Sequence, residues 1–258
     1  MENDNTNWVI IGAIASVICA VVGILSLFDV NLKSAKSSET KEVVQKTSGP
    51  EYTKRADDNS SKNSNQISVE AVDLGLSVRW ADKNVGASSP EEYGDYYAWG
   101  EIKSKRNYSI NKYRWYSIWS DKLKKYCVDR ERGKVDGKTV LENEDDVARV
   151  KWGDGWRIPT EREFRDLMNH CTWTWSVQNG TGGFFVTGRN GNSIFLPAAG
   201  YREDRQLINL GVNGFYLTNE LNLSYDYWAV VFEFGPNKSW RIVDFIRTHG
   251  ASVRPVYD

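Results

Sequence analysis

The residues that could do chemistry are few and scattered along the chain. The sequence has only two histidines, His170 and His249, which lie far apart, and it contains no Walker loop, GxSxG motif or CxxC pair. A histidine that directly follows a helix more often hydrogen-bonds with the last carbonyls of that helix than acts in catalysis. We therefore predict that the chain is not an enzyme and uses no cofactor.

The cysteines and the acidic residues offer two further kinds of site. Cys127 and Cys171 could form a disulfide if the domain lies outside the cytosol, and the alternative is two free thiols. The third cysteine, Cys19, lies in an apolar N-terminal run. The acidic residues within 142–146 do not have the spacing of an EF-hand, so we predict no metal site there.

The composition favours a contact surface over a nucleic-acid site. The 258 residues carry 33 Lys or Arg against 34 Asp or Glu, and the net charge of -1 leaves no overall basic footprint for nucleic acid. Aromatic residues make up 13%, and such rigid amphipathic side chains suit a binding surface as well as a core. Residues 102–143 interleave basic and aromatic residues, as binders of single-stranded nucleic acid do. We interpret them instead as a long insertion loop anchored by its Trp and Tyr side chains.

The first 67 residues predict a membrane attachment. Residues 1–7 are polar, and residues 8–28 are all apolar or small, which matches the ~20 residues that a transmembrane helix needs. A cleaved signal peptide is the alternative, although no Lys or Arg precedes the run. Residues 29–67 are rich in polar and charged residues, which predicts a disordered linker. The Lys residues after the span place the domain in the cytoplasm by the positive-inside rule.

Residues 68–258 are predicted to form one folded α+β domain, whose clearest local signals lie at its centre. Thr160 and Glu163 have the spacing of a capping box, and the apolar residues after them have the periodicity of an amphipathic helix that ends at about Cys171. Two β-rich runs then flank Asn190-Gly191, which predicts a hairpin with a type I′ turn.

Other elements follow from apolar alternation, acidic helix starts and turn residues. We predict strands at 74–80, 95–99, 229–234, 240–245 and 252–256, a short helix at 145–152 and a turn at 235–237. Two short helices with twisted antiparallel sheets are therefore expected.

Several motifs resemble the bacterial "major paralogous domain" family. They occur in one order: VDLGLSVRWADKNVGA at 72–87, YGDYYAWGE at 93–101, WGDGWRIPTEREF at 152–164, NGNSIFLPAAGYR at 190–202 and GASVRPV at 250–256. The resemblance covers most of residues 68–258. It implies a C-type-lectin-like fold, related to formylglycine-generating enzymes and to ligand-binding proteins diversified by retroelements. It also implies a domain outside the cytoplasm, against the positive-inside reading.

The same resemblance implies a role for residues 214–249. In the diversified relatives, the C-terminal strands and their turns present the ligand-binding side chains, and this segment has the aromatic and polar composition of a paratope. The predicted ligand-binding residues are Tyr216, Asn219, Asn222, Tyr225, Tyr227, Asn237, Trp240, Arg241, Asp244 and Arg247. Residues 215–220 depart from the sequence expected of such members, so the local surface is expected to differ.

These observations predict a membrane-anchored protein that binds a protein or glycan ligand at the cell surface. One alternative is a structural or adhesion subunit of the envelope without a variable site. A second is an enzyme of the formylglycine-generating type. Those relatives use a reactive cysteine pair near the C-terminus, and no cysteine follows Cys171 here, which disfavours the enzyme.

Overall fold

The computed structural model describes residues 68–237 and 239–258. The predicted N-terminal segments 1–7, 8–28 and 29–67 lie outside these residues. Among the residues described, no helix is long and apolar enough to cross a membrane.

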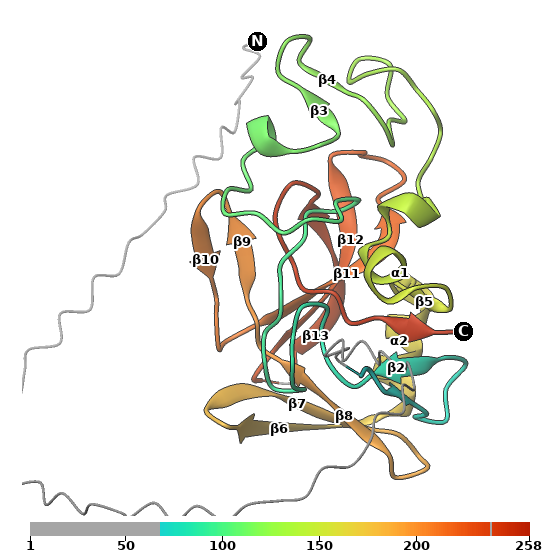
Figure 1. Cartoon of the computed structure of the whole chain (residues 1–258), viewed down its shortest axis with the longest axis vertical. Helices are drawn as coiled ribbons and strands as arrows, with labels where there is room; N and C mark the ends of the chain where they lie inside the picture. The colour runs from blue at the N-terminus through green and yellow to red at the C-terminus, as the bar shows by residue number, and fades with distance from the viewer. Residues whose placement is uncertain (1–67, 238) are drawn as a thin grey trace, which may run out of the picture. The chain divides into compact units, whose positions relative to one another are not determined.

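The domain is α+β and is built mainly of small antiparallel sheets (Figure 1). One sheet has the strand order β1 (Ala71–Val72), β2 (Arg79–Ala81), β14 (Val256–Tyr257) and β5 (Trp156–Arg157). A second consists of β6 (Thr172–Gln178), β7 (Thr181–Thr187) and β8 (Ser193–Pro197). A third consists of β11 (Gly214–Leu221), β12 (Trp228–Gly235) and β13 (Ser239–Ile246).

Short elements complete the domain. Two separate two-stranded pairs are β3 (Tyr116–Ser117) with β4 (Lys122–Leu123), and β9 (Tyr201–Glu203) with β10 (Gln206–Ile208). The helices are α1 (Val147–Trp152), α2 (Glu161–His170) and the 3-10 turns η1 (Ile110–Lys112) and η2 (Asn143–Asp145).

Helix α2 begins as the sequence predicts. The Thr160 side chain accepts a hydrogen bond from the Glu163 backbone N–H, and the Glu163 carboxylate accepts one from the Thr160 backbone N–H, which confirms the capping box. The helix ends at His170, with Cys171 as its C-cap. Glu163 also pairs with Arg157 at 2.6 Å, and Arg157 in turn pairs with Asp258, so the helix start is tied to the end of the chain.

The predicted hairpin at Asn190-Gly191 forms between β7 and β8, but its turn is not type I′. The Gly191 N–H donates to the Gly188 carbonyl at 3.0 Å, and of the two central candidates only Gly191 has a positive φ, at 87°. A type I′ turn needs positive φ at both central residues, whereas a longer loop with one glycine in the left-handed region needs it once. The extra residues of this loop let Asn190 and Asn192 reach Asp73, whose carbonyl accepts from both amide groups.

Three predicted strands are shorter than expected. The run at 74–80 is extended only from Arg79, because Gly75 has a φ of 72° and interrupts it. In 95–99 only Tyr97 forms a bridge, and the N–H groups of Asp95 and Trp99 donate to carbonyls outside that pairing. The closing strand is reduced to β14, since Pro255 has no N–H to donate. The helix predicted at 145–152 begins as η2 and continues as α1, with Asp146 capping α1.

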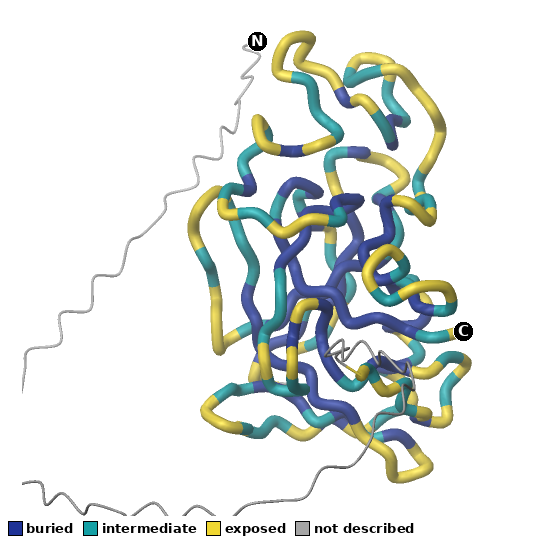
Figure 2. Tube along the Cα trace, viewed as in Figure 1, coloured by how far each residue is buried: buried dark blue, intermediate teal, exposed yellow. Residues whose placement is uncertain are grey.

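The core runs through β11 and β12, which Figure 2 shows as almost continuously buried. Phe164 of α2 stacks on Phe232 of β12 with ring centroids 4.8 Å apart, and Trp173 of β6 packs on the same ring. A second cluster on the other side of the strands includes Trp99, Tyr126 and Val231. The strand confirmed at 229–234 therefore lies in the core, whereas the strand confirmed at 240–245 is partly exposed at the edge of the same sheet.

Candidate functional site

The segment predicted as an insertion loop docks onto the loop between β11 and β12, residues 222–227. The backbone N–H groups of Val128 and Asp129 donate to the carboxylate of Asp226 at 3.0 and 3.4 Å. The Arg132 guanidinium lies over the Tyr227 ring, 4.9 Å from its centroid. Two segments about a hundred residues apart in sequence therefore form one end of the domain (Figure 1).

A buried arginine holds this end together. Arg247 is 1% exposed; its Nη1 donates to the carbonyl oxygens of Tyr126 and Asp226, both at 2.8 Å, and its Nε donates to Tyr113 Oη at 2.9 Å. Its guanidinium also lies 5.2 Å from the centroid of Trp99. Burial raises the pKa of Tyr113 to about 12, against the effect of Arg247, so this hydroxyl stays protonated at neutral pH.

A second cation, Lys125, links the insertion to the acidic residues that follow it. Lys125 Nζ pairs with Asp145 at 2.5 Å and with Glu144 at 3.3 Å, and it also pairs with Glu142. Burial alone would lower the pKa of Lys125, but the hydrogen bonds to these carboxylates outweigh it and raise the pKa. The three carboxylates are spaced to hold a metal ion, yet a lysine ammonium already sits among them. We therefore assign them to an ion-pair network.

The two docked segments enclose a hollow of about 280 Å³. It is lined by Tyr116, Asp121, Lys122, Leu123, Glu131, Arg132 and Tyr227. Burial raises the pKa of Tyr227 although Arg132 opposes the shift, and a hydrogen bond to Asp121 raises the pKa of Tyr116 to about 12. At neutral pH the hollow therefore offers two neutral phenols and charged groups of both signs, which suits hydrogen bonding to a polar ligand.

Four predicted ligand-binding residues lie in the β11–β12 loop or are hydrogen-bonded to it, and one of them, Tyr227, lines the hollow. Asn222 Nδ2 donates to Asp244 Oδ1 at 2.8 Å, and Asn222 Oδ1 accepts from the backbone N–H of Tyr225 at 3.1 Å. Tyr225 is 61% exposed, and Tyr227 lines the hollow itself. The exposed apolar side chains of Leu223 and Trp228 complete what we call the distal surface: Asn222, Leu223, Tyr225, Tyr227, Trp228, Asp244 and the hollow.

Three others lie at the opposite end of the same sheet. Asn237 is in the turn between β12 and β13, and Trp240 and Arg241 follow it on β13. Trp240 is half-buried and stacks on Trp173 with centroids 5.2 Å apart, and Arg241 pairs with Glu233 at 2.9 Å. Strands β12 and β13 are each eight residues long, at ~3.3 Å per residue. The two ends of the sheet are therefore too far apart to belong to one ligand contact patch.

Two predicted contact residues, Tyr216 and Arg247, are buried and cannot contact a ligand, and a third, Asn219, is partly buried and stays a prediction. Tyr216 is fully buried and donates its hydroxyl hydrogen to the Pro197 carbonyl at 2.7 Å. Arg247 is the buried connector described above. Asn219 is half-buried, and its buried Oδ1 has no hydrogen-bond partner in the described part of the chain. The polar type of these residues predicts exposure, whereas hydrogen bonds to distant backbone carbonyls hold the side chains of Tyr216 and Arg247 inside the domain.

Six of the seven lining residues are not predicted by the sequence: Tyr116, Asp121, Lys122, Leu123, Glu131 and Arg132. The interleaving of basic and aromatic residues in 102–143 was the available signal. The interpretation of this segment as a loop held by its aromatic side chains is confirmed for Tyr108, Tyr113 and Tyr126, which are buried, but not for Trp119, which is exposed.

Of the two alternatives left open by the sequence, the structure has the free thiols: Cys127 and Cys171 are not joined by a disulfide. Cys127 is buried and its Sγ donates to the Asp129 carbonyl at 3.1 Å, while Cys171 ends α2. Burial raises the pKa of both thiols. Neither residue is therefore placed as an activated nucleophile.

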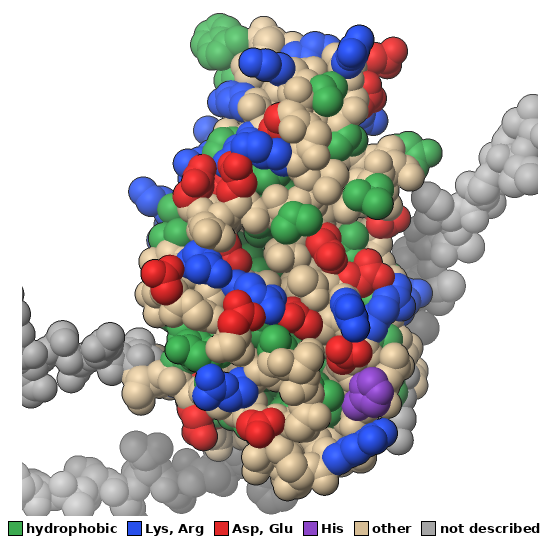
Figure 3. Space-filling view, turned by 90° about the vertical axis from the view of Figure 1, so that its right-hand side faces the viewer, with side chains coloured by type: hydrophobic (Ala, Val, Ile, Leu, Met, Phe, Trp, Pro, Cys, Tyr) green, Lys and Arg blue, Asp and Glu red, His purple; other side chains and the backbone are tan. Residues whose placement is uncertain are grey.

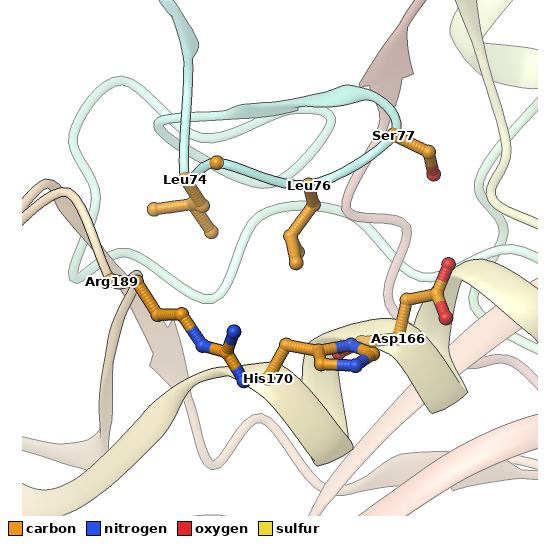
Figure 4. A pocket seen from close by; sticks show the side chains of 7 residues that line it. Leu74, Leu76, Ser77, Asp166, His170 and Arg189 are labelled. Carbon is orange, nitrogen blue, oxygen red and sulfur yellow. The ribbon is translucent and has the colours of Figure 1, made fainter.

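A pocket beside α2 brings the exposed histidine near polar groups (Figure 4). It has a volume of about 250 Å³ and is lined by Ser77, Asp166, His170 and Arg189 among others. His170 Nδ1 lies 3.0 Å from the Asp166 carbonyl oxygen, which confirms the helix-end role expected from the sequence. The Asp166 carboxylate points away from the imidazole, so the Ser, His and Asp side chains do not form a catalytic relay (Figure 4).

Comparison with protein-family models, with curated proteins and with solved structures found no match to this chain.

Proposed function

We propose that this chain is a membrane-anchored, non-enzymatic recognition protein whose distal surface binds a protein or glycan ligand at the cell surface. The observation that carries the proposal is that two half-buried tyrosines and several charged side chains from two separate segments line one hollow, and that the exposed Tyr225 and Trp228 lie in or next to the loop that contributes Tyr227. Aromatic anchors with hydrogen-bonding neighbours are the usual composition of a paratope. The anchor itself is the apolar run at 8–28, which has the length of a transmembrane helix.

The fold and family belong to the same proposal. The motif resemblance supports a C-type-lectin-like fold of the "major paralogous domain" type, with the folded domain outside the cytoplasm. The pairing of β1, β2 and β14, which joins the first and last strands of the domain, and the long loops at one end of a central sheet are compatible with it.

Rigidity supports binding over a purely structural role for these loops. The hydrogen bonds of Arg247 fix the backbone at Tyr126 and Asp226, and Gly133 packs so closely on β4 that an added Cβ would lie 2.4 Å from the Leu123 carbonyl oxygen. A surface that is ordered before binding loses less conformational entropy on association. The loops are therefore held in place while their exposed side chains stay free for contacts.

The test uses the full chain embedded in lipid nanodiscs and labelled with a fluorophore. It is applied to a glycan array and to intact bacterial cells, and two double variants are compared with the wild type. Tyr225→Ala with Asp244→Ala alters the distal surface, and Asn237→Ala with Arg241→Ala alters the opposite end of the sheet. We expect the first pair to weaken binding at least about tenfold and the second to leave it unchanged.

Each other outcome is informative. Loss of binding only in the second pair would place the ligand site at the β12–β13 turn. Equal binding by all three proteins, or no binding of the wild type to either panel, contradicts recognition through the distal surface and favours a structural subunit.

A further inference from the structure

The insertion carries a concentrated positive charge that the whole-chain average hides. Residues 103–138 contain twelve Lys or Arg and four Asp or Glu, a net charge of +8, in a chain whose total is -1. Nine of the twelve basic side chains are exposed: Lys103, Arg106, Lys112, Arg114, Lys122, Lys124, Arg130, Lys134 and Lys138. In Figure 3 the upper end of the domain accordingly shows mainly Lys and Arg beside exposed hydrophobic groups.

The turn of the β3–β4 hairpin places two large apolar side chains in solvent. Trp119 is 94% exposed and Ile118 is 56% exposed, between the strands that end at Ser117 and begin at Lys122. At this exposure, the Trp119 ring has almost no packing contact with the described part of the chain. Exposed apolar side chains at the tip of a hairpin in a strongly basic segment match the two components of an anionic membrane surface.

We propose that this hairpin docks the domain on an anionic lipid bilayer. Trp119 and Ile118 enter the interfacial region, where the amphipathic indole ring is favoured. The exposed Lys and Arg side chains of the insertion lie against the anionic headgroups. The tip residues Ile118 and Trp119 lie outside the distal surface, although the same hairpin also contributes Tyr116, Asp121, Lys122 and Leu123 to the lining of the hollow. The proposal does not rest on the proposed recognition function.

The aromatic side chains of the insertion favour a bilayer over nucleic acid. A site for single-stranded nucleic acid stacks successive bases on several free aromatic rings along a basic groove. Here Tyr108 and Tyr113 are buried and donate to the carbonyls of Tyr96 and Trp99, each at 2.7 Å. Trp115 is half-buried and donates to Gly100, which leaves Trp119 beside an aliphatic neighbour. One exposed indole next to an isoleucine suits insertion into lipid.

The experiment uses the full chain in nanodiscs of phosphatidylcholine, mixed with sucrose-loaded vesicles that are then sedimented. The vesicles contain phosphatidylcholine alone or with phosphatidylglycerol. We expect the wild type to co-sediment only with the anionic vesicles, and less as salt is added. Trp119→Ser is expected to weaken binding at least about tenfold, and Lys112→Gln with Lys124→Gln by about fivefold for each charge removed.

Matched controls separate this contact from general effects. Val177→Ser removes an exposed apolar side chain from β6, and Arg162→Gln with Arg205→Gln removes two exposed charges elsewhere. Tyr225→Ala tests the distal surface. All three variants are expected to bind the vesicles as the wild type does, so a failure of the recognition proposal and a failure of this one give different patterns.

A second readout reports insertion directly. Brominated lipids quench tryptophan emission, and the difference in quenching between the wild type and Trp119→Phe isolates the emission of Trp119 while keeping an aromatic ring at the tip. Stronger quenching of the wild type by anionic brominated vesicles supports insertion. Equal quenching, vesicle binding that survives Trp119→Ser, or Trp119-dependent binding to single-stranded DNA or heparin in place of vesicles overturns the proposal.

Discussion

Arg247 donates a hydrogen bond from Nη1 to the carbonyl oxygen of Asp226 at 2.8 Å, and the Asp226 carboxylate in turn accepts from the backbone of the insertion. The end of β13, the β11–β12 loop and the insertion are therefore joined through one buried cation and one buried carboxylate. The distal surface depends on this connection, although neither side chain lines its hollow.

Replacing Arg247 by Lys is expected to lower the free energy of unfolding by about 3 kcal/mol, because a lysine cannot reach Tyr113, Tyr126 and Asp226 together and leaves buried acceptors unpaired. Urea denaturation of the chain in nanodiscs measures the change. Arg241→Lys, which alters an exposed arginine, is the control. A cost below about 1 kcal/mol would show that the network is not required for stability.

Truncation of Trp240 to Ala is expected to destabilise the protein more than truncation of Tyr227 to Ala. Trp240→Ala removes a ring that packs on Trp173 and Phe184 and should cost about 2 kcal/mol. Tyr227→Ala removes a ring whose main partner is the partly exposed Arg132, and should cost about 1 kcal/mol or less. Thermal unfolding of both variants checks the order, and equal melting temperatures would contradict the different packing of the two rings.

The helix start is a third test. Thr160→Ala removes the acceptor for the Glu163 N–H and is expected to cost about 1 kcal/mol, whereas Thr160→Ser keeps the acceptor and should cost little. Both variants are compared by chemical denaturation. If Ser and Ala destabilise equally, the hydroxyl group does not provide the stabilisation.

The lowered pKa of His249 predicts that the stability of the domain depends on pH. Burial lowers its pKa below the ordinary value of 6.5, although Glu203 and Asp204 oppose the shift. The pKa of His249 is lower in the folded state than in the unfolded state. Its contribution to the free energy of unfolding is therefore fully present above pH 6.5 and is lost as the pH falls through the folded-state pKa. The ring is stacked on Tyr201, and His249→Gln should flatten the loss of stability below pH 6.5. A melting curve series from pH 8 to 5 that is identical in both proteins would disprove this role.

The thiols give the last prediction. Cys127 is buried and Cys171 is only partly so, therefore a thiol reagent should modify Cys171 first and reach Cys127 only on unfolding. Peptide mapping by mass spectrometry separates the two sites. Recovery of a peptide pair linked through Cys127 and Cys171 would show that the disulfide does form.

Local signals in the sequence were sufficient wherever neighbouring residues decide the structure. The capping box at Thr160, the end of α2 at Cys171 and the β12–β13 hairpin depend on hydrogen bonds and apolar spacing within a few residues. The extent of the strand after Gly75 was less predictable. The positive φ of Gly75 interrupts the extended backbone, but the alternation of apolar residues in the sequence gives no sign of it.

The sequence by itself therefore determined the α+β class, the main helix and hairpins, and the presence of many aromatic and polar residues near the C-terminus. Only the tertiary structure decided which of those residues face solvent. Tyr216 and Arg247 are buried because distant carbonyls accept their hydrogen bonds, and Tyr227 meets Arg132 because a buried arginine joins segments far apart in the chain. Side-chain type sets what a residue can bond to, whereas its partners across the fold set whether it is available to a ligand.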